Sequence, residues 1–472
     1  MRHAAAYTAI KLNSARKTVL LMSLEDIEEF ILSKIRESRL PGLSIGIVKD
    51  GELIYARGFG FRDIERGLPA TPRTIYGIGS MTKSFTALAI LKLVEEGRLS
   101  LDDPVDRYVQ VRLNPRGSVT IHHLLTHSSG LPALGYAEAY VNGVLGLDSN
   151  WLPLATPEDV LTFMRDAADW AVARPGERFF YLNEGYVILG LIIKKVSGMP
   201  YEDFVRERIL KPLGMDRTYF KADEVLKDPE VATPYIIDRE GKHIPSKFPF
   251  GITSDGGLLS NVIDMSKYVT MLINRGEYNG TRILSKELLE TAERGYIDVP
   301  WKIIGDERYG YGLIISQNFY GRKLIEHSGN VGVYTADMAY VPSDRVGVVI
   351  MANAEGYSLS KMGIYILSKL LGHDPSELMP FMIENVNKRL EGVYKTYGDT
   401  VKISIQAQGD YLVMRSSTKY TEEVTILIPD EVRRDYARFY TLMNGAKIPA
   451  EFFIEGDRVI LIYERFKFIK RE

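Results

Sequence analysis

Residues 75–97 read IYGIGSMTKSFTALAILKLVEEG, a glycine-rich apolar run that passes directly into an apolar helix pattern ending at Gly97. Ser80 and Lys83 lie three positions apart in this stretch, so they share one helix face and the hydroxyl and the amine can meet. A serine hydroxyl is a poor nucleophile without an adjacent base, and a buried lysine can act as that base. Ser80 also begins the helix, where free backbone N–H groups favour a developing oxyanion. The stretch therefore predicts a nucleophile with its activating base.

The Ser-x-x-Lys spacing is weak on its own, because the chain repeats it in Ser14/Lys17, Ser358/Lys361 and Ser416/Lys419. The local alternative for Ser80 is a serine that caps a helix, followed by a solvated lysine. The decision between the two interpretations therefore depends on what else the chain contains.

Two further segments carry suitable chemistry. The first is Tyr181-Leu182-Asn183, ahead of a helix pattern, where a phenol could shuttle a proton and an amide could bond the lysine and the substrate; in isolation it predicts a buried aromatic and a helix cap. The second is Glu326-His327-Ser328-Gly329-Asn330, between two strand patterns, where the glycine allows close backbone approach and the histidine could hold a carboxylate or assist proton transfer. The alternative there is a turn with a solvated histidine.

Taken in order, Ser-x-x-Lys, Tyr-x-Asn and His-x-Gly resemble the motif set of class C β-lactamases, D-Ala-D-Ala carboxypeptidases and the CubicO group of serine hydrolases. The segments 120–131, 210–215 and 256–260 strengthen the resemblance, which covers roughly residues 24–372. It implies an α+β fold, a β-lactamase/transpeptidase-like sandwich in which an antiparallel sheet is flanked by helices, with a helical subdomain.

The resemblance also implies roles for individual residues. Ser80 attacks, Lys83 takes its proton, Tyr181 assists proton transfer, and which of Lys83 and Tyr181 is the principal base stays open. The remaining roles are orientation by Asn183, an oxyanion hole from the N–H groups of Ser80 and Asn330, and substrate binding by His327, Ser328 and Gly329. Because His327 stands where this family often has a lysine, carboxylate recognition could depend on pH. The six other histidines are interpreted as structural or surface residues, and no metal or cofactor is expected.

The chain changes character near residue 390, where short alternating runs separated by turns predict an all-β barrel. A catalytic domain joined to such a barrel is similar to the archaeal lipocalin-linked serine peptidases of the CubicO group, which implies a homo-oligomer, an octamer in that group. The expected organisation is an artefactual or disordered extension over residues 1–22, a catalytic domain over 23–375, a linker over 376–388 and a lipocalin-like barrel over 389–472.

Composition narrows the class of protein. Of 472 residues, 59 are Lys or Arg and 61 are Asp or Glu, and this balance does not suggest a nucleic-acid partner. No apolar run approaches the roughly 18 residues that span a membrane. The chain has no cysteine, which removes thiol catalysis and fits a cytoplasmic location. Scarce glutamine (Gln110, Gln317, Gln406 and Gln408) with abundant charge is typical of thermophilic, archaeal-looking proteins.

The leading hypothesis from sequence is a serine peptidase that forms an acyl-enzyme with short peptides, including peptides that contain D-amino acids. An esterase or β-lactam hydrolase would use the same residues. A penicillin-binding sensor would acylate without turnover, and a lipocalin-like carrier would have a degenerate catalytic domain.

Overall fold

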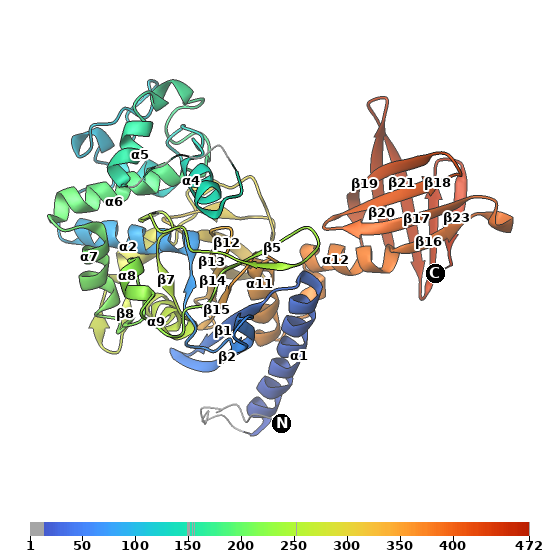
Figure 1. The fold of residues 1–472 in the computed structure, drawn as a ribbon, viewed down its shortest axis with the longest axis horizontal. Coiled ribbons are helices and arrows are strands. Elements are labelled where there is room, and N and C mark those ends of the chain that lie inside the picture. Colours follow the sequence, from blue (N-terminus) through green and yellow to red (C-terminus); the bar gives the residue numbers. More distant parts are fainter. Residues whose placement is uncertain (1–13, 149–151, 153, 155, 252, 472) are drawn as a thin grey trace. The chain divides into compact units, whose positions relative to one another are not determined.

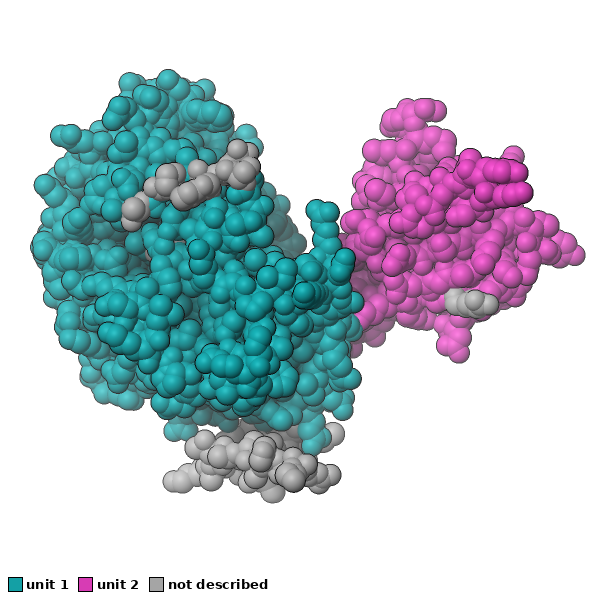
Figure 2. Space-filling view, in the orientation of Figure 1, with its two compact units in different colours: residues 1–373 teal, residues 374–472 magenta. Residues whose placement is uncertain are grey.

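The computed structural model describes residues 14–148, 152, 154, 156–251 and 253–471, without the side chains of residues 14–23. By its internal contacts the chain divides into two compact units, Met1–His373 and Asp374–Glu472, which Figure 2 distinguishes by colour. Each unit has a hydrophobic core of its own. No helix in the described part of the chain is both long enough and apolar enough to cross a bilayer.

The first unit is built on a nine-stranded antiparallel sheet with the order β10-β11-β12-β13-β14-β15-β1-β2-β3 (Figure 1). Strand β1 pairs with β15, so the two ends of this unit share one sheet, and the expected α+β sandwich is confirmed. The strands are β1 (Gly42–Lys49), β2 (Glu52–Asp63), β3 (Leu68–Pro69), β10 (Ile297–Asp298), β11 (Arg308–Tyr309), β12 (Ile314–Phe319), β13 (Arg322–Asn330), β14 (Thr335–Val341) and β15 (Val346–Ala352). Three short pairs lie outside this sheet: β4 (Tyr76–Gly77) with β7 (Leu259–Ser260), β5 (Tyr235–Ile237) with β6 (His243–Pro245), and β8 (Glu277–Tyr278) with β9 (Thr281–Arg282).

Helices cover both faces of the sheet. A Cβ on Gly347 of β15 would lie 2.6 Å from Val269 of α9, whereas a Cβ on Gly363 of α11 would lie 3.5 Å from Val348. Since adjacent strand residues point to opposite faces, α9 and α11 lie on opposite sides of β15. The helices of this unit are α1 (Ser14–Ser38), α2 (Thr82–Glu95), α3 (Ile121–Leu125), α4 (Tyr136–Leu145), α5 (Pro157–Phe163), α6 (Asn183–Ser197), α7 (Tyr201–Val205), α8 (Ala222–Val225), α9 (Val262–Ile273), α10 (Lys286–Ala292) and α11 (Leu359–Leu370), with short helical turns η1 (Gly79–Met81), η2 (Val105–Arg107), η3 (Ala167–Trp170) and η4 (Arg206–Leu210).

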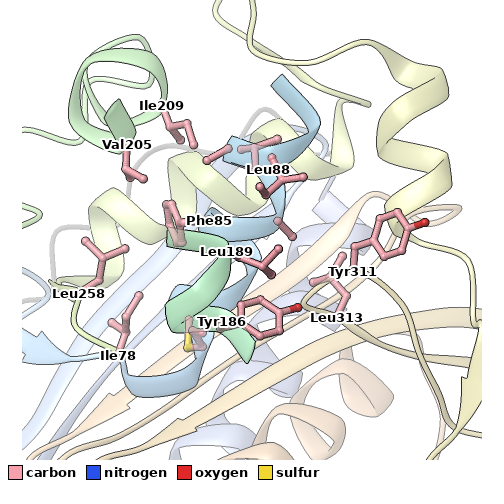
Figure 3. Close-up of a cluster of buried hydrophobic side chains, with 14 of the residues drawn as sticks. Ile78, Phe85, Leu88, Tyr186, Leu189, Val205, Ile209, Leu258, Tyr311 and Leu313 are labelled. Atoms are coloured by element: carbon pink, nitrogen blue, oxygen red, sulfur yellow. The ribbon is translucent and has the colours of Figure 1, made fainter. Parts of the chain in front are cut away.

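Helix α2 lies in the middle of the main core. Its side chains pack with those of α6, η4 and the loop before β12, and Figure 3 shows Phe85 and Leu88 of α2 among residues that include Leu189 and Leu313. The side chain of Phe85 is fully buried and stacks on Tyr268 with ring centroids 4.0 Å apart. The helix that carries Lys83 is therefore held on all sides, which fixes the position of its first turn.

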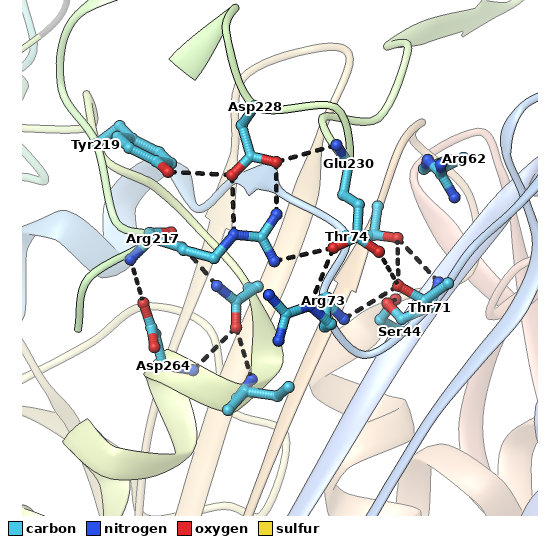
Figure 4. A network of polar contacts seen from close by, with 12 residues as sticks. Ser44, Arg62, Thr71, Arg73, Thr74, Arg217, Tyr219, Asp228, Glu230 and Asp264 are labelled. Carbon is cyan, nitrogen blue, oxygen red and sulfur yellow. Dashed lines mark hydrogen bonds and ion pairs between the residues drawn. The ribbon is translucent and has the colours of Figure 1, made fainter. Parts of the chain in front are cut away.

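A polar network fixes the chain that leads to Ser80 (Figure 4). Arg217 donates to both Asp228 and Glu230, and Glu230 accepts from Arg73 at 3.1 Å and from Thr71 at 3.2 Å. These contacts join the segments on the two sides of α8 to the loop that precedes β4, which leads to the nucleophile.

The second unit is a closed barrel of eight strands in which each strand pairs with the next and β16 pairs with β23, so the expected C-terminal barrel is confirmed. Its interior contains the fully buried side chains of Phe439, Phe452 and Leu461. The strands are β16 (Gly392–Lys395), β17 (Lys402–Gln408), β18 (Tyr411–Ser417), β19 (Glu422–Val432), β20 (Tyr436–Met443), β21 (Ala446–Glu455), β22 (Arg458–Tyr463) and β23 (Phe466–Lys470), with the short turns η5 (Pro375–Glu377) and η6 (Tyr397–Asp399).

Two segments differ from their expected character. The segment 376–388, expected to be a linker, mostly forms helix α12 (Met379–Leu390), whose Val386 and Leu390 belong to the barrel core. Its apolar spacing is that of a packed amphipathic helix, which a linker would not need. Of the expected extension over residues 1–22, residues 1–13 lie outside the described part. Residues 14–22 belong to helix α1, which begins at Ser14.

Candidate active site

Ser80 lies in η1, the tight turn that leads into α2. The residue before it, Gly79, has φ +50°, and a Cβ there would lie 2.7 Å from the backbone N of Asn330. The chain before the turn is anchored by the N–H of Ile78, which donates to the carbonyl of Leu258 at 2.9 Å. Glycine is thus required for the conformation and for the close approach, and the turn presents Ser80 at the start of a helix.

The Lys83 amine is fully buried and has three polar neighbours. Its Nζ lies 3.0 Å from Ser80 Oγ, 2.8 Å from Asn183 Oδ1 and 2.7 Å from the carbonyl oxygen of Asp255. The amide and carbonyl oxygens can only accept hydrogen bonds. When the amine is neutral, these two acceptors take its two hydrogens and the lone pair is left to face the Ser80 hydroxyl. The arrangement can therefore withdraw the serine proton.

Asn183 and Tyr181 reach this amine from the start of α6. Asn183 is the first residue of the helix, which directs its side chain toward Lys83. Tyr181 presents the face of its ring, whose centroid lies 4.8 Å from Lys83 Nζ. A cation is attracted to such a face, so Tyr181 would stabilise the lysine once it has taken a proton.

His127 was interpreted from sequence only as a structural or surface histidine, and it is a buried residue of the candidate site. Its carbonyl accepts from the N–H of Phe180 at 2.8 Å, its Nδ1 accepts from the N–H of Leu182 at 3.0 Å, and its ring centroid lies 4.2 Å from that of Tyr181. Burial and the nearby Lys83 hold the pKa of the imidazole well below its usual range. His127 therefore fixes the backbone on both sides of Tyr181, at Phe180 through its carbonyl and at Leu182 through its neutral ring.

His327 is buried and has both ring nitrogens engaged. Nδ1–H donates to the carbonyl of Ser328 at 2.6 Å, and Nε2 accepts from the Tyr309 hydroxyl at 2.9 Å. Burial and Lys83 lower the pKa of His327 to about 3, so the ring is neutral near pH 7. The neutral ring and its two hydrogen bonds therefore argue against the expected pH-dependent recognition of a carboxylate by His327.

The end of β13 packs directly on the nucleophile turn. A Cβ on Gly329 would lie 1.9 Å from the carbonyl oxygen of Ile78 and 2.9 Å from the backbone N of Ser80. This approach brings the backbone N of Asn330 close to that of Ser80, which is the arrangement that the expected oxyanion hole needs. The Asn330 side chain is held separately, since it donates to Glu355 Oε1 at 2.6 Å and accepts from Gly332 N–H at 2.7 Å.

A cavity of about 320 Å³ opens beside the nucleophile. Of the predicted site residues, Ser80, Asn183 and Asn330 line it, and α4 and the segment after β13 supply most of the remaining wall. Its charged lining residues, within the part of the chain that the structure describes, are the three acids Glu138, Asp255 and Glu355. The full lining is Ser80, Ala137, Glu138, Val141, Asn142, Asn183, Asp255, Gly256, Asn330, Val331, Gly332 and Glu355.

The other predicted site residues do not line this cavity but lie next to the residues that do. Lys83 bonds to Ser80 and Asn183, and Tyr181 contacts Lys83, while His327 lies with its ring centroid 6.5 Å from that of Tyr181. Ser328 is exposed, and its carbonyl bonds to His327. Asp255 has no signal of its own in the sequence, because its contact to Lys83 comes from a backbone carbonyl. The only indication is the neighbouring Gly256-Gly257, which lies in one of the segments that strengthen the family resemblance.

Comparison with known proteins gives matches over both units. The Beta-lactamase family model matches residues 27–369, and the model of the Pab87 octamerisation domain matches residues 375–469. The chain is similar to a solved structure described as the octameric penicillin-binding protein homologue from Pyrococcus abyssi, with 52% identity, a TM-score of 0.91, and coverage of 95% of this chain and 100% of the other.

Two further relatives match less of the chain. The structure of a penicillin binding protein from Bacillus halodurans is 28% identical, with a TM-score of 0.59, over 72% of this chain and 97% of that one. Protein flp of Staphylococcus aureus is 29% identical over 360 residues, which are 74% of this chain and 67% of its own length.

Proposed function

Since the chain belongs to the Beta-lactamase family of serine hydrolases, we propose that it hydrolyses short peptides, including peptides with D-amino acids, through an acyl-enzyme on Ser80. The observation that carries the proposal is the position of Lys83 Nζ, 3.0 Å from Ser80 Oγ and bonded to two oxygens that can only accept. A serine and a lysine held in this way have the geometry of an activated nucleophile.

In the proposed reaction, the lone pair of Lys83 takes the Ser80 proton as Oγ attacks the scissile carbonyl carbon. The oxyanion that forms is stabilised by the N–H groups of Ser80 and Asn330. The amine leaving group then receives a proton, through Lys83 or the Tyr181 phenol, and the C–N bond breaks to give the acyl-enzyme. Water then attacks the ester carbonyl carbon and gives a proton to the same groups. The bond between the acyl carbon and Ser80 Oγ breaks, Oγ takes back a proton, and the product leaves as a carboxylic acid.

The charge of the cavity favours some substrates over others. Glu138 and Glu355 are exposed carboxylates on its wall, and they would repel a substrate carboxylate bound beside Ser80. The neutral His327 offers no compensating cation. Internal peptide bonds and peptide amides therefore fit this cavity better than β-lactams or C-terminal acids, which carry a carboxylate near the reacting carbonyl.

Covalent labelling tests the proposal. Wild-type protein treated with a fluorophosphonate should be labelled on one residue, and peptide mapping should find the label on Ser80. The Ser80→Ala variant should lose the label, whereas Ser358→Ala, which changes the serine of another Ser-x-x-Lys at the start of α11, should keep it. Labelling of Ser80→Ala at wild-type rate would overturn the assignment.

A substrate panel separates the alternatives. Release of product from L- and D-residue peptides by wild type, lost in Ser80→Ala, supports the peptidase. Activity restricted to esters or to a chromogenic β-lactam indicates an esterase or a β-lactam hydrolase instead. A fluorescent penicillin that labels Ser80 and does not decay indicates a sensor, and absence of any labelling indicates a carrier. A cytoplasmic location stays a prediction from sequence.

The second unit supports a proposal of assembly into a homo-octamer. Outward-facing residues of β19 and β20 form an exposed apolar patch, made of Val424, Ile426, Ile428 and Leu442. Such a patch, 38–62% exposed, is unusual on a barrel that only faces water. The assignment of residues 374–472 as a separate assembly domain is part of the same proposal. Native mass spectrometry should give eight chains for wild type and smaller species for Ile426→Glu; an unchanged mass in the variant would contradict the role of this patch.

A further inference from the structure

Tyr136, the first residue of α4, is a buried tyrosine that the proposed chemistry does not use. Its hydroxyl donates to Asp255 Oδ2 at 2.6 Å, and its backbone N–H donates to Glu184 Oε1 at 3.2 Å. Burial and the carboxylate of Asp255 raise the pKa of the phenol well above its usual range, so the phenol keeps its proton and remains a donor.

The two hydrogen-bond partners of Tyr136, Asp255 and Glu184, are close in sequence to the groups that accept from Lys83. Asp255 supplies the carbonyl that accepts from Lys83 Nζ at 2.7 Å, and Glu184 follows Asn183, whose side chain accepts from the same nitrogen at 2.8 Å. Hydrogen bonds therefore link Lys83 to Asp255 and Asp255 to Tyr136. Tyr136 is bonded in turn to Glu184, next to the Asn183 that also accepts from Lys83.

The Asp255 carbonyl decides which way the Lys83 amine points. A neutral amine has two hydrogens, and with both Asn183 Oδ1 and the Asp255 carbonyl in place its lone pair faces Ser80. If the Asp255 carbonyl turns away, the amine can rotate and direct a hydrogen at the Ser80 hydroxyl, which removes the base. The bond from Tyr136 holds the Asp255 side chain, and with it the turn that carries this carbonyl.

The same helix forms one wall of the cavity. Ala137, Glu138, Val141 and Asn142 of α4 line it, directly after Tyr136. A substrate that packs against this wall therefore contacts α4, the helix whose Tyr136 is hydrogen-bonded to Asp255.

We propose that Tyr136 is a positioning residue, which fixes the Asp255 carbonyl so that Lys83 keeps its lone pair on Ser80, and which joins this anchor to the α4 wall of the cavity. The inference rests on the proposed function, because it assumes that Lys83 activates Ser80. It assigns Tyr136 no contact with the reacting atoms.

The test compares Tyr136→Phe with Tyr140→Phe in the full-length protein. Tyr140 lies one turn further along α4, and its hydroxyl donates to the carbonyl of Phe250, away from Lys83. The probe is a fluorophosphonate, for which saturation kinetics separate the binding constant KI from the rate constant of acylation, kinact. We expect kinact to fall about tenfold or more in Tyr136→Phe, with KI little changed, and neither to change in Tyr140→Phe.

A double-mutant cycle identifies the route of the effect. If Tyr136 acts through Asp255, then Asp255→Ala should lower kinact in the same way, and adding Tyr136→Phe to it should have little further effect. Asp255→Asn keeps an oxygen that accepts from the phenol and should retain most of kinact. Folding is monitored by Tm for each variant.

The outcomes distinguish failure of the proposed function from failure of the positioning role of Tyr136. If wild type is not labelled on Ser80, the proposed function fails. If wild type is labelled and Tyr136→Phe has the wild-type kinact, with or without a lower Tm, only the positioning role is overturned. Fully additive effects of Tyr136→Phe and Asp255→Ala would also overturn it.

Discussion

The ring of His127 accepts a hydrogen bond from the backbone N–H of Leu182 at 3.0 Å. The carbonyl of the same histidine accepts from Phe180 at 2.8 Å, so one buried residue fixes the chain on both sides of Tyr181. Because Tyr181 and Asn183 both contact Lys83, His127 helps to determine where two of the groups around this amine lie.

Replacing His127 should therefore affect catalysis through Tyr181. His127→Phe keeps an aromatic ring but leaves the buried N–H of Leu182 without its acceptor, which should cost about 1–3 kcal/mol of stability. We expect kinact for fluorophosphonate labelling to fall about tenfold as Tyr181 moves. His127→Asn, whose amide oxygen can accept and which tolerates the φ of +55° at this position, should recover much of both. Equal kinact values for wild type and His127→Phe would show that the hydrogen bond from Leu182 to His127 is not needed for acylation.

Gly329 should be essential for acylation for a steric reason. Its added Cβ in Gly329→Ala would lie 1.9 Å from the Ile78 carbonyl, so β13 must move away from the Ser80 turn and separate the two N–H groups of the oxyanion hole. Loss of one such donor costs about a hundredfold or more in rate. Gly185→Ala is the matched control, because its Cβ would meet neighbouring atoms only at 3.5 Å. Labelling rates of the two variants within a factor of two of each other would contradict the prediction.

The sequence predicted the parts of this site that depend on local spacing. Ser80 and Lys83 lie one helical turn apart in the same segment, so their contact follows from the local spacing. Asn183 begins a recognisable helix, and its contact with Lys83 follows once the family resemblance places the two motifs in one site. The role of Asp255 was invisible because a backbone carbonyl has no side-chain signature. The burial of His327 was equally hidden, because its partner Tyr309 comes from β11, which β12 separates from β13 in the sheet.

His327 should remain uncharged across the range in which most histidines titrate. Its pKa of about 3 means that the imidazole stays neutral from pH 8 down to pH 5, whereas in the unfolded chain it gains a proton below about 6.5. Stability is therefore lost as pH falls through that range, because the unfolded state binds the extra proton. NMR of ring-labelled histidine should show no titration of His327 between pH 5 and pH 8. A shift with a midpoint near 6.5 would mean that the ring is not buried as described.

Two buried carboxyl groups should have the opposite effect on stability. Glu326 and Asp337 lie on neighbouring strands, and burial raises the pKa of Glu326 to about 7 and that of Asp337 well above its usual range. Glu326 accepts from Ser360 at 2.7 Å, whereas neither oxygen of Asp337 has a partner among the described residues. The folded chain thus binds protons that the unfolded chain releases near pH 4, so this contribution to stability is full below that pH and, for Glu326, is lost as pH rises through about 7.

Asp337→Asn replaces a buried carboxyl group, whose pKa is raised by burial and by Glu326, with an amide that does not titrate. We expect its Tm to exceed that of wild type at pH 8, and the difference to shrink as pH falls toward 4, because the unfolded wild-type chain releases its proton above that pH. The exposed Asp166→Asn should give the same small change at both pH values. Asp337 lies opposite Ser328 in the register of β14 with β13, so its protonation acts on the stability of the strand that ends at the nucleophile turn. A Tm difference that does not depend on pH would mean that the pKa of Asp337 is not raised in the folded protein.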